Sequence, residues 1–173
     1  MATRQARLAR GEPAAFAELY DRCADRVGHY LLVRLGSWQD AEETLQETFL
    51  RLVHQRQKLA GVENLLAYVF TVARNEAARL AARRARRPQV PLDAETLFQL
   101  APSTDGAQEA AERVAGALES LGPEWREIVE LKTYAGLTFH EISRMTGLTQ
   151  GTVATRYRSA LAKMQAWLGR HEP

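Results

Sequence analysis

The chain has 173 residues, 46% of them hydrophobic and 25% charged, with a formal net charge of +2. This composition excludes a disordered chain and is sufficient for one or two small packed domains. Its single cysteine, Cys23, excludes an internal disulfide and predicts a buried, inert thiol in a cytoplasmic protein. We expect no secretory signal and no membrane insertion, because no apolar run is long enough to span a bilayer.

Apolar residues recur at three- and four-residue steps in the first half of the chain, which predicts three helices. The first helix opens at Pro13, a residue suited to a first helical turn. The second opens on the capping-box-like Ser37-Trp38-Gln39-Asp40 and turns four residues inward: Ala41, Leu45, Phe49 and Leu52. A loop at Leu59–Val62 precedes the third helix, which runs from about Asn64 to Arg87. Three further aromatic residues are predicted to lie in the core: Tyr20, Trp38 and Trp125.

A proline-rich stretch follows the third helix, which Pro88 ends because proline cannot continue the hydrogen-bonding pattern. Residues 88–108 contain three prolines, a Ser-Thr-Asp-Gly cluster and no basic residue. This composition predicts a flexible linker, with a short turn at 96–100. The chain is therefore expected to be all-α, with two small helical domains at 10–87 and 109–170 joined by the linker 88–108.

The C-terminal half is again helical, and Thr138–Lys163 is predicted to be a helix-turn-helix. Thr138 and Glu141 form a capping box for a short helix, Gly147 makes a tight turn, and Thr149 caps a longer helix. The inward stripe of that longer helix is predicted to hold Val153, Tyr157, Leu161, Met164 and Leu168. An ordinary αα-hairpin is the alternative to a DNA-binding unit.

The outward face of the last helix predicts contacts with DNA. Arginine can read guanine in the major groove, and hydroxyl groups can contact either base, so Arg158 is expected to face the bases. Residues near the helix start or on its flank are expected to contact phosphate: Gln150, Thr152 and Arg156. The candidate DNA-binding residues of this helix are Gln150, Thr152, Thr155, Arg156, Arg158 and Ser159.

The second helix carries an outer stripe of Glu43, Gln46, Glu47 and Leu50 opposite its apolar face. An exposed leucine framed by acids and a glutamine is typical of a protein docking patch. A solvated helix face with one incidental leucine is the alternative.

The third helix combines basic residues with aromatic residues near its start. Such a surface can hold single-stranded DNA by stacking and by neutralising phosphates. The candidate residues are Tyr68, Arg74, Asn75, Arg79, Arg83 and Arg84.

Three segments resemble the extracytoplasmic-function group of sigma factors, in the sigma-70 family. DAEETLQETFLRLV, at Asp40–Val53, is similar to the polymerase-binding helix of that group. AYVFTVARNEAARLAARRAR, at Ala67–Arg86, resembles its helix for the downstream, or −10, promoter element. Ala117–Leu168 looks like its C-terminal domain, which binds the upstream, or −35, element. The resemblance covers nearly the whole chain, in the order of the family.

The resemblance implies a non-enzymatic protein that binds core RNA polymerase and promoter DNA, and that initiates transcription. It also implies a cognate anti-sigma factor as a further partner. Asp40 joins the outer stripe as a polymerase-binding residue, and extruded bases are expected at the loop 59–64. The sequence departs from the family pattern at Tyr68, where tryptophan is usual, and at Arg79, where many members have aspartate. A frequent basic residue of the last helix is replaced by Ala154.

Other functions account for less of the sequence. A two-domain helix-turn-helix regulator leaves the outer stripe of the second helix and the arginines of the third without a role. A helical adaptor leaves the basic face of the last helix unexplained. His140-Glu141 begins like a zinc-protease motif, but Arg144 stands where the second histidine would be. No catalytic residue, metal site or cofactor is expected.

Overall fold

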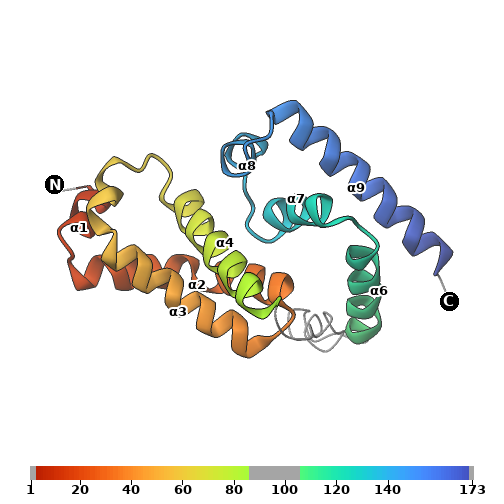
Figure 1. Ribbon diagram of the computed structural model, residues 1–173, viewed down its shortest axis with the longest axis horizontal. Helices are drawn as coiled ribbons and strands as arrows, with labels where there is room; N and C mark the ends of the chain where they lie inside the picture. The colour runs from red at the N-terminus through yellow and green to blue at the C-terminus, as the bar shows by residue number, and fades with distance from the viewer. Residues whose placement is uncertain (1–2, 86–105, 172–173) are drawn as a thin grey trace. The chain divides into compact units, whose positions relative to one another are not determined.

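The computed structural model describes residues 3–85 and 106–171, and within these ranges the chain is helical. It divides into two compact units, Met1–Gln89 and Val90–Pro173, which are considered separately (Figure 1). Most of the predicted linker, 88–105, and the predicted turn at 96–100 lie outside the described residues. Helix α6 begins at Ala107, inside the last two positions of the predicted linker 88–108.

The first unit contains the following helical elements: α1 Arg4–Ala9, α2 Pro13–Leu35, α3 Trp38–His54, the 3-10 helix η1 Arg56–Gly61 and α4 Leu65–Arg84. The core forms where α2, α3 and α4 pack against one another, as Figure 1 shows. At its centre the rings of Tyr30 and Phe70 meet edge to face, with centroids 5.6 Å apart. Both side chains are fully buried, so this pair fixes the position of α4 on α2.

Two elements of this unit differ from the sequence-based expectation. The six-residue helix α1 was not predicted, because it offers one fully buried anchor, Leu8, and is too short to show a periodic pattern. It packs against η1, whose own Leu59 is fully buried, so the predicted loop at 59–62 is largely a 3-10 helix. The last helix of the unit, α4, ends at Arg84 rather than Arg87.

The inward face of α3 is rotated relative to the prediction. Ala41 and Leu52 are buried as expected, but Thr44 and Thr48 complete the buried stripe, while Leu45 and Phe49 are half-buried. The Thr48 hydroxyl donates a 2.7 Å hydrogen bond to the Thr44 carbonyl, which satisfies its polar group inside the core. Because Thr44 and Thr48 are polar, the spacing of large apolar residues does not reveal this stripe.

The predicted core position of two aromatic residues is wrong. Trp38 is 60% exposed at the start of α3, and Tyr20 is 44% exposed on α2. The ring of Tyr20 instead lies against Phe49 at the edge of the α2–α3 contact, with centroids 4.9 Å apart. Trp125, in the second unit, is half-buried.

Cys23 is buried, as predicted, and its thiol donates to the Leu19 carbonyl at 3.0 Å. Burial raises the pKa of the Cys23 thiol to about 11, so the reactive thiolate is scarce at neutral pH. Among the helices that the structure describes, none has the length and apolar character needed to cross a membrane.

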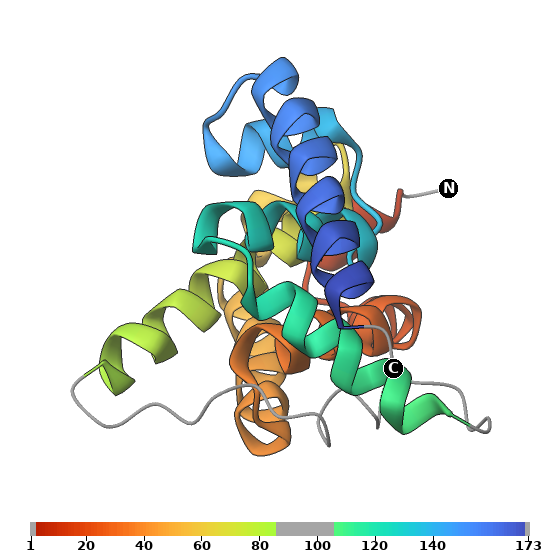
Figure 2. The same cartoon turned by 90° about the vertical axis from the view of Figure 1, so that its right-hand side faces the viewer.

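The second unit contains four described helices: α6 Ala107–Glu119, α7 Pro123–Thr133, α8 Phe139–Thr146 and α9 Gln150–Arg170. The long helix α9 packs against each of the other three, so it is the element around which the unit is built (Figure 2). Its fully buried residues are Val153 and Ala160, whereas Leu161, predicted inward, is 40% exposed. The small Ala160 lets the neighbouring helices approach α9, and Tyr157 fills the flank by packing on Phe139.

Helix α6 and the C-terminal part of α9 meet at a glycine. A Cβ atom added to Gly116 would overlap the indole ring of Trp167. The ring also stacks on His171, with centroids 4.0 Å apart, so it has little freedom to move aside. Gly116 is therefore required by the close approach of the two helices.

We expect Gly116→Ala to lower the free energy of unfolding by about 1–3 kcal/mol, because overpacking outweighs the gain in helix propensity. Gly169→Ala is the matched control, since a Cβ at Gly169 meets nothing within 4 Å. The control is expected to be neutral or slightly stabilising. Thermal unfolding followed by circular dichroism and tryptophan fluorescence checks both, and a Gly116→Ala protein as stable as wild type would contradict the packing argument.

Candidate protein and nucleic-acid interfaces

The outer face of α3 is exposed where the sequence predicted a docking patch. Glu43, Gln46 and Glu47 are exposed, and Leu50 has 52% of its surface accessible. Val53, one turn beyond Leu50 and 39% exposed, extends the apolar part of the patch and was not predicted. We call Glu43, Gln46, Glu47, Leu50 and Val53 the α3 outer stripe. It places apolar surface within an acidic frame, an arrangement that suits a protein partner.

Asp40 is not part of this stripe. It is 2% exposed, and its carboxylate accepts from both terminal nitrogens of Arg84 at the end of α4. Ser37 caps α3 by accepting from the Asp40 backbone N–H at 3.4 Å, so the predicted capping box is half formed. The structure thus pairs two candidate residues that the sequence had assigned to different partners.

A second buried carboxylate, Glu76, lies in the middle of α4, eight positions before Arg84. One of its oxygens accepts from Arg51 of α3 at 3.1 Å and from Arg79 at 2.6 Å. The Glu76 side chain is 9% exposed and that of Arg79 is 56% exposed. Arg79 therefore reaches the surface while one of its nitrogens bonds to the buried Glu76 carboxylate. Glu76 was missed because its spacing from Arg51 gives no signal in the sequence.

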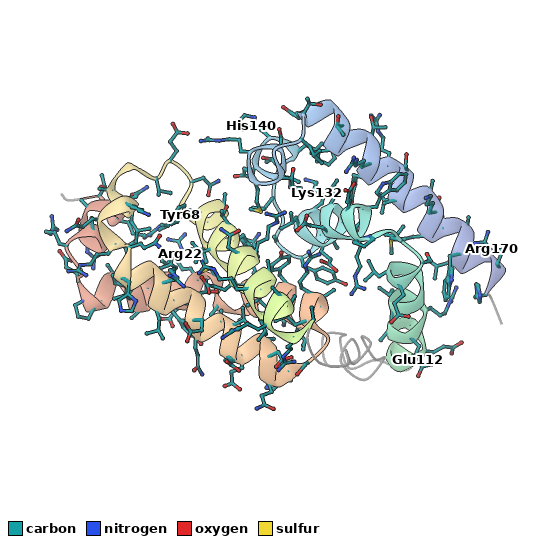
Figure 3. The ribbon with its side chains drawn as sticks, in the orientation of Figure 1. Arg22, Tyr68, Glu112, Lys132, His140 and Arg170 are labelled. Carbon is teal, nitrogen blue, oxygen red and sulfur yellow. The ribbon has the colours of Figure 1, made fainter. Side chains whose placement is uncertain are left out.

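The other candidate residues of α4 occupy different depths. Asn75 and Arg83 are exposed, whereas Arg74 and Tyr68 are half-buried, Tyr68 in the first turn of the helix (Figure 3). Asn64 caps this helix by accepting from the Ala67 N–H at 3.1 Å. The accessible part of the predicted base-binding loop is therefore reduced to residues 60–64, between buried Leu59 and the helix start.

The predicted helix-turn-helix is present in α8 and α9. Thr138 and Glu141 form both hydrogen bonds of the capping box, and Gly147 ends α8 in the left-handed conformation, with φ of 75°. Thr149 caps α9 through a 3.2 Å bond from the Thr152 N–H. The Ser143 hydroxyl donates to the Leu148 carbonyl at 2.6 Å and closes the turn. These local bonds fix the direction in which α9 leaves the turn.

The candidate DNA-binding residues of α9 fall into two groups. Gln150, Thr155 and Arg158 are exposed, whereas Thr152, Arg156 and Ser159 are half-buried. Arg158 bonds only weakly to its own helix, from Nε to the Ala154 carbonyl at 3.3 Å. Its guanidinium can therefore leave this contact for a base at little cost.

Arg156 has a partner that the sequence did not reveal. It donates to Glu124 in the first turn of α7 at 2.7 Å, and its side chain is 28% exposed. Lys163, also on α9, lies over the ring of Trp125 at 4.1 Å from the centroid. Part of the positive charge that the sequence places on α9 is thus balanced within the unit.

The described residues contain no group of histidine, cysteine, aspartate or glutamate side chains that could hold a metal ion. The geometry described above is that of surfaces for macromolecular partners: an apolar stripe on α3, a basic face on α4 and a helix-turn-helix.

Comparison with known proteins shows which family the chain resembles. The model for sigma-70 region 2 matches residues 19–87, and the model for sigma-70 region 4 matches residues 117–166. The RNA polymerase sigma factor CarQ of Myxococcus xanthus is 30% identical, with 94% of each chain covered. The ECF RNA polymerase sigma factor SigK of Mycobacterium bovis is also 30% identical, over 92% of this chain and 88% of its own.

The fold is likewise similar to that of a sigma factor whose structure is solved. RpoE of Bartonella quintana, crystallised with the anti-sigma factor NepR, superimposes with a TM-score of 0.73 at 19% identity. The match covers 91% of this chain and 98% of the other.

Proposed function

Because the chain belongs to the sigma-70 family, in its extracytoplasmic-function group, we propose that particular residues of its two units divide the work of a sigma factor. The protein binds core RNA polymerase and directs it to promoters, where transcription starts. The observation that carries the residue assignment is the exposed apolar stripe on α3, in a different unit from the helix-turn-helix. A DNA-binding regulator alone has no need of that stripe.

Core polymerase is proposed to dock on the α3 outer stripe. Leu50 and Val53 supply apolar area at the centre, and Glu43, Gln46 and Glu47 form a polar rim. Interfaces of this kind derive most of their binding energy from a few central side chains. Asp40 is excluded from the contact because it is buried.

The exposed face of α4 is proposed to bind the melted downstream element. Asn75, Arg79 and Arg83 reach the surface, and Tyr68 lies near the helix start, where a base can stack. In the second unit, α9 is proposed to enter the major groove at the upstream element. Arg158 reads a base there, and Arg156 approaches a phosphate.

Three further properties are part of the proposal. The protein acts in the cytoplasm, where polymerase and promoters are, and it performs no catalysis of its own. A cognate anti-sigma factor is a further proposed partner, by family resemblance, and it acts by covering the surface that faces polymerase. Its binding would compete with core polymerase for the α3 outer stripe.

We expect the double substitution Leu50→Asp with Gln46→Ala to weaken association with core polymerase at least about tenfold, or roughly 1.4 kcal/mol. A carboxylate placed at the centre of an apolar contact loses its hydration without gaining a partner. Co-purification with core polymerase and a run-off transcription assay measure the effect.

The control is His29→Asp, which adds the same charge at an exposed position of α2. It is expected to leave association unchanged, and both proteins are expected to keep their helical circular dichroism. If the double variant co-purifies with polymerase as well as wild type does, the docking assignment is wrong.

We expect Arg158→Ala to cost about 1–3 kcal/mol and to relax specificity at one upstream base pair. Arg156→Ala is expected to weaken all promoters alike and to flatten the salt dependence, by less than a full phosphate contact because Glu124 already shares its charge. Holoenzyme binding to a panel of single-base promoter variants measures both. An even loss over all sequences for Arg158→Ala would exchange the two roles.

A further inference from the structure

The last turn of α4 is anchored differently from the rest of the helix. From Val69 to Leu80 the helix buries one side chain or more in each turn, but every residue from Ala81 to Ala85 is exposed. A helix end without apolar anchoring frays readily, because its last carbonyl groups have no partners within the helix. The position of Arg83, which lies in this turn, therefore depends on some polar contact.

The ion pair between Arg84 and Asp40 is that contact. Both terminal nitrogens of Arg84 bind the two oxygens of the Asp40 carboxylate, the geometry in which arginine holds a carboxylate most firmly. Asp40 is itself fixed, since it lies in the first turn of α3, where its backbone N–H bonds to Ser37. The first turn of α3 thus holds the last turn of α4.

A second ion pair shows that the same two helices are joined at another level. Arg51, near the end of α3, binds Glu76 in the middle of α4, so the helices run antiparallel (Figure 1). Eight residues separate Glu76 from Arg84, about 12 Å along a helix. The Asp40–Arg84 pair therefore extends the contact between α3 and α4 to the end of α4, beyond the last buried apolar residue.

Arg84 cannot bind DNA without breaking its ion pair with Asp40. A phosphate that took its guanidinium would leave the carboxylate of Asp40 buried and unpaired, which is strongly unfavourable. Arg83, the preceding residue, is exposed, and it binds no carboxylate among the residues that the structure describes. Of the two adjacent arginines, Arg84 is thus held in an ion pair, and Arg83 is the one that can bind a phosphate.

We propose that Asp40 is a positioning residue for DNA binding: through Arg84 it holds the last turn of α4 in place, so that Arg83 meets a phosphate of the downstream element. Arg84 itself makes no DNA contact. This inference rests on the proposed binding of downstream DNA by α4.

The direction in which Asp40→Asn changes the affinity for DNA separates this role from direct DNA contact by Arg84. If Arg84 bound phosphate and Asp40 merely competed for it, Asp40→Asn would free the guanidinium and tighten DNA binding. If Asp40 positions the turn, Asp40→Asn loosens Arg83 and weakens DNA binding. Asp25→Asn, at an exposed site on α2, is the control for the general effect of removing one negative charge.

The test uses holoenzyme and a fork-junction promoter with a single-stranded downstream segment, with affinity followed by fluorescence anisotropy. Asp40→Asn and Arg84→Gln are each expected to weaken binding by about three- to tenfold, and Asp25→Asn to leave it unchanged or slightly tighter. In an Arg83→Ala background, Asp40→Asn is expected to add less than about a twofold loss, because its effect passes through Arg83. Association with core polymerase is expected to stay normal in all of them.

Tighter binding by Asp40→Asn, fully additive losses with Arg83→Ala, or loss of core association by Asp40→Asn would each overturn the inference. Should Asp40→Asn fail to fold, Arg84→Gln in the Arg83→Ala background decides, since Arg84→Gln changes a half-exposed side chain at a helix end. A direct phosphate contact by Arg84 would add its full loss in that background, whereas a positioning role adds less than about a twofold loss. If Arg83→Ala and Asn75→Ala both leave binding unchanged, the downstream role of α4 itself fails. That outcome is distinct from failure of the positioning role alone.

Discussion

The ion pairs between α3 and α4 tie the two proposed working surfaces of the first unit together. Asp40 and Glu76 are nearly buried carboxylates, and each is neutralised by an arginine of the other helix. Loss of Arg84 leaves the buried Asp40 carboxylate uncompensated, so the start of α3 and the end of α4 cannot shift independently at low cost. Glu76 keeps its bond to Arg79 if Arg51 moves away. Since α3 faces polymerase and α4 faces DNA in the proposed function, docking on one surface sets the place of the other.

The second unit obtains its geometry from local bonds instead. The capping box at Thr138, the left-handed Gly147 and the cap at Thr149 set the ends of α8 and α9 through contacts between neighbouring residues. Packing of Trp167 on Gly116 then anchors the far end of α9 to α6. The recognition surface is consequently short and presented by one helix, with the charge of Arg156 balanced by Glu124 and Lys163 held over the ring of Trp125.

The features that could be predicted from sequence are those decided by neighbouring residues. Caps, prolines at helix starts and the helix-turn-helix depend on spacings of three or four residues, and the structure confirms them. The buried state of Asp40 depends on Arg84, 44 positions away, and a carboxylate beside an acidic stripe looks solvent-exposed in the sequence. The phase of α9 was misjudged because Leu161 is larger than Ala160, although the smaller residue permits the closer helix contact.

We infer that this protein acts as part of RNA polymerase and not alone, because each unit presents a single small DNA-binding surface. The most direct measurement compares binding of the chain to a selected promoter with and without core polymerase, together with run-off transcription from the same template. We expect weak, poorly specific binding by the free chain, and specific binding with a transcript when core polymerase is added. Nanomolar, sequence-specific binding by the chain alone, with no polymerase-dependent transcript, would contradict it and favour a self-sufficient helix-turn-helix regulator.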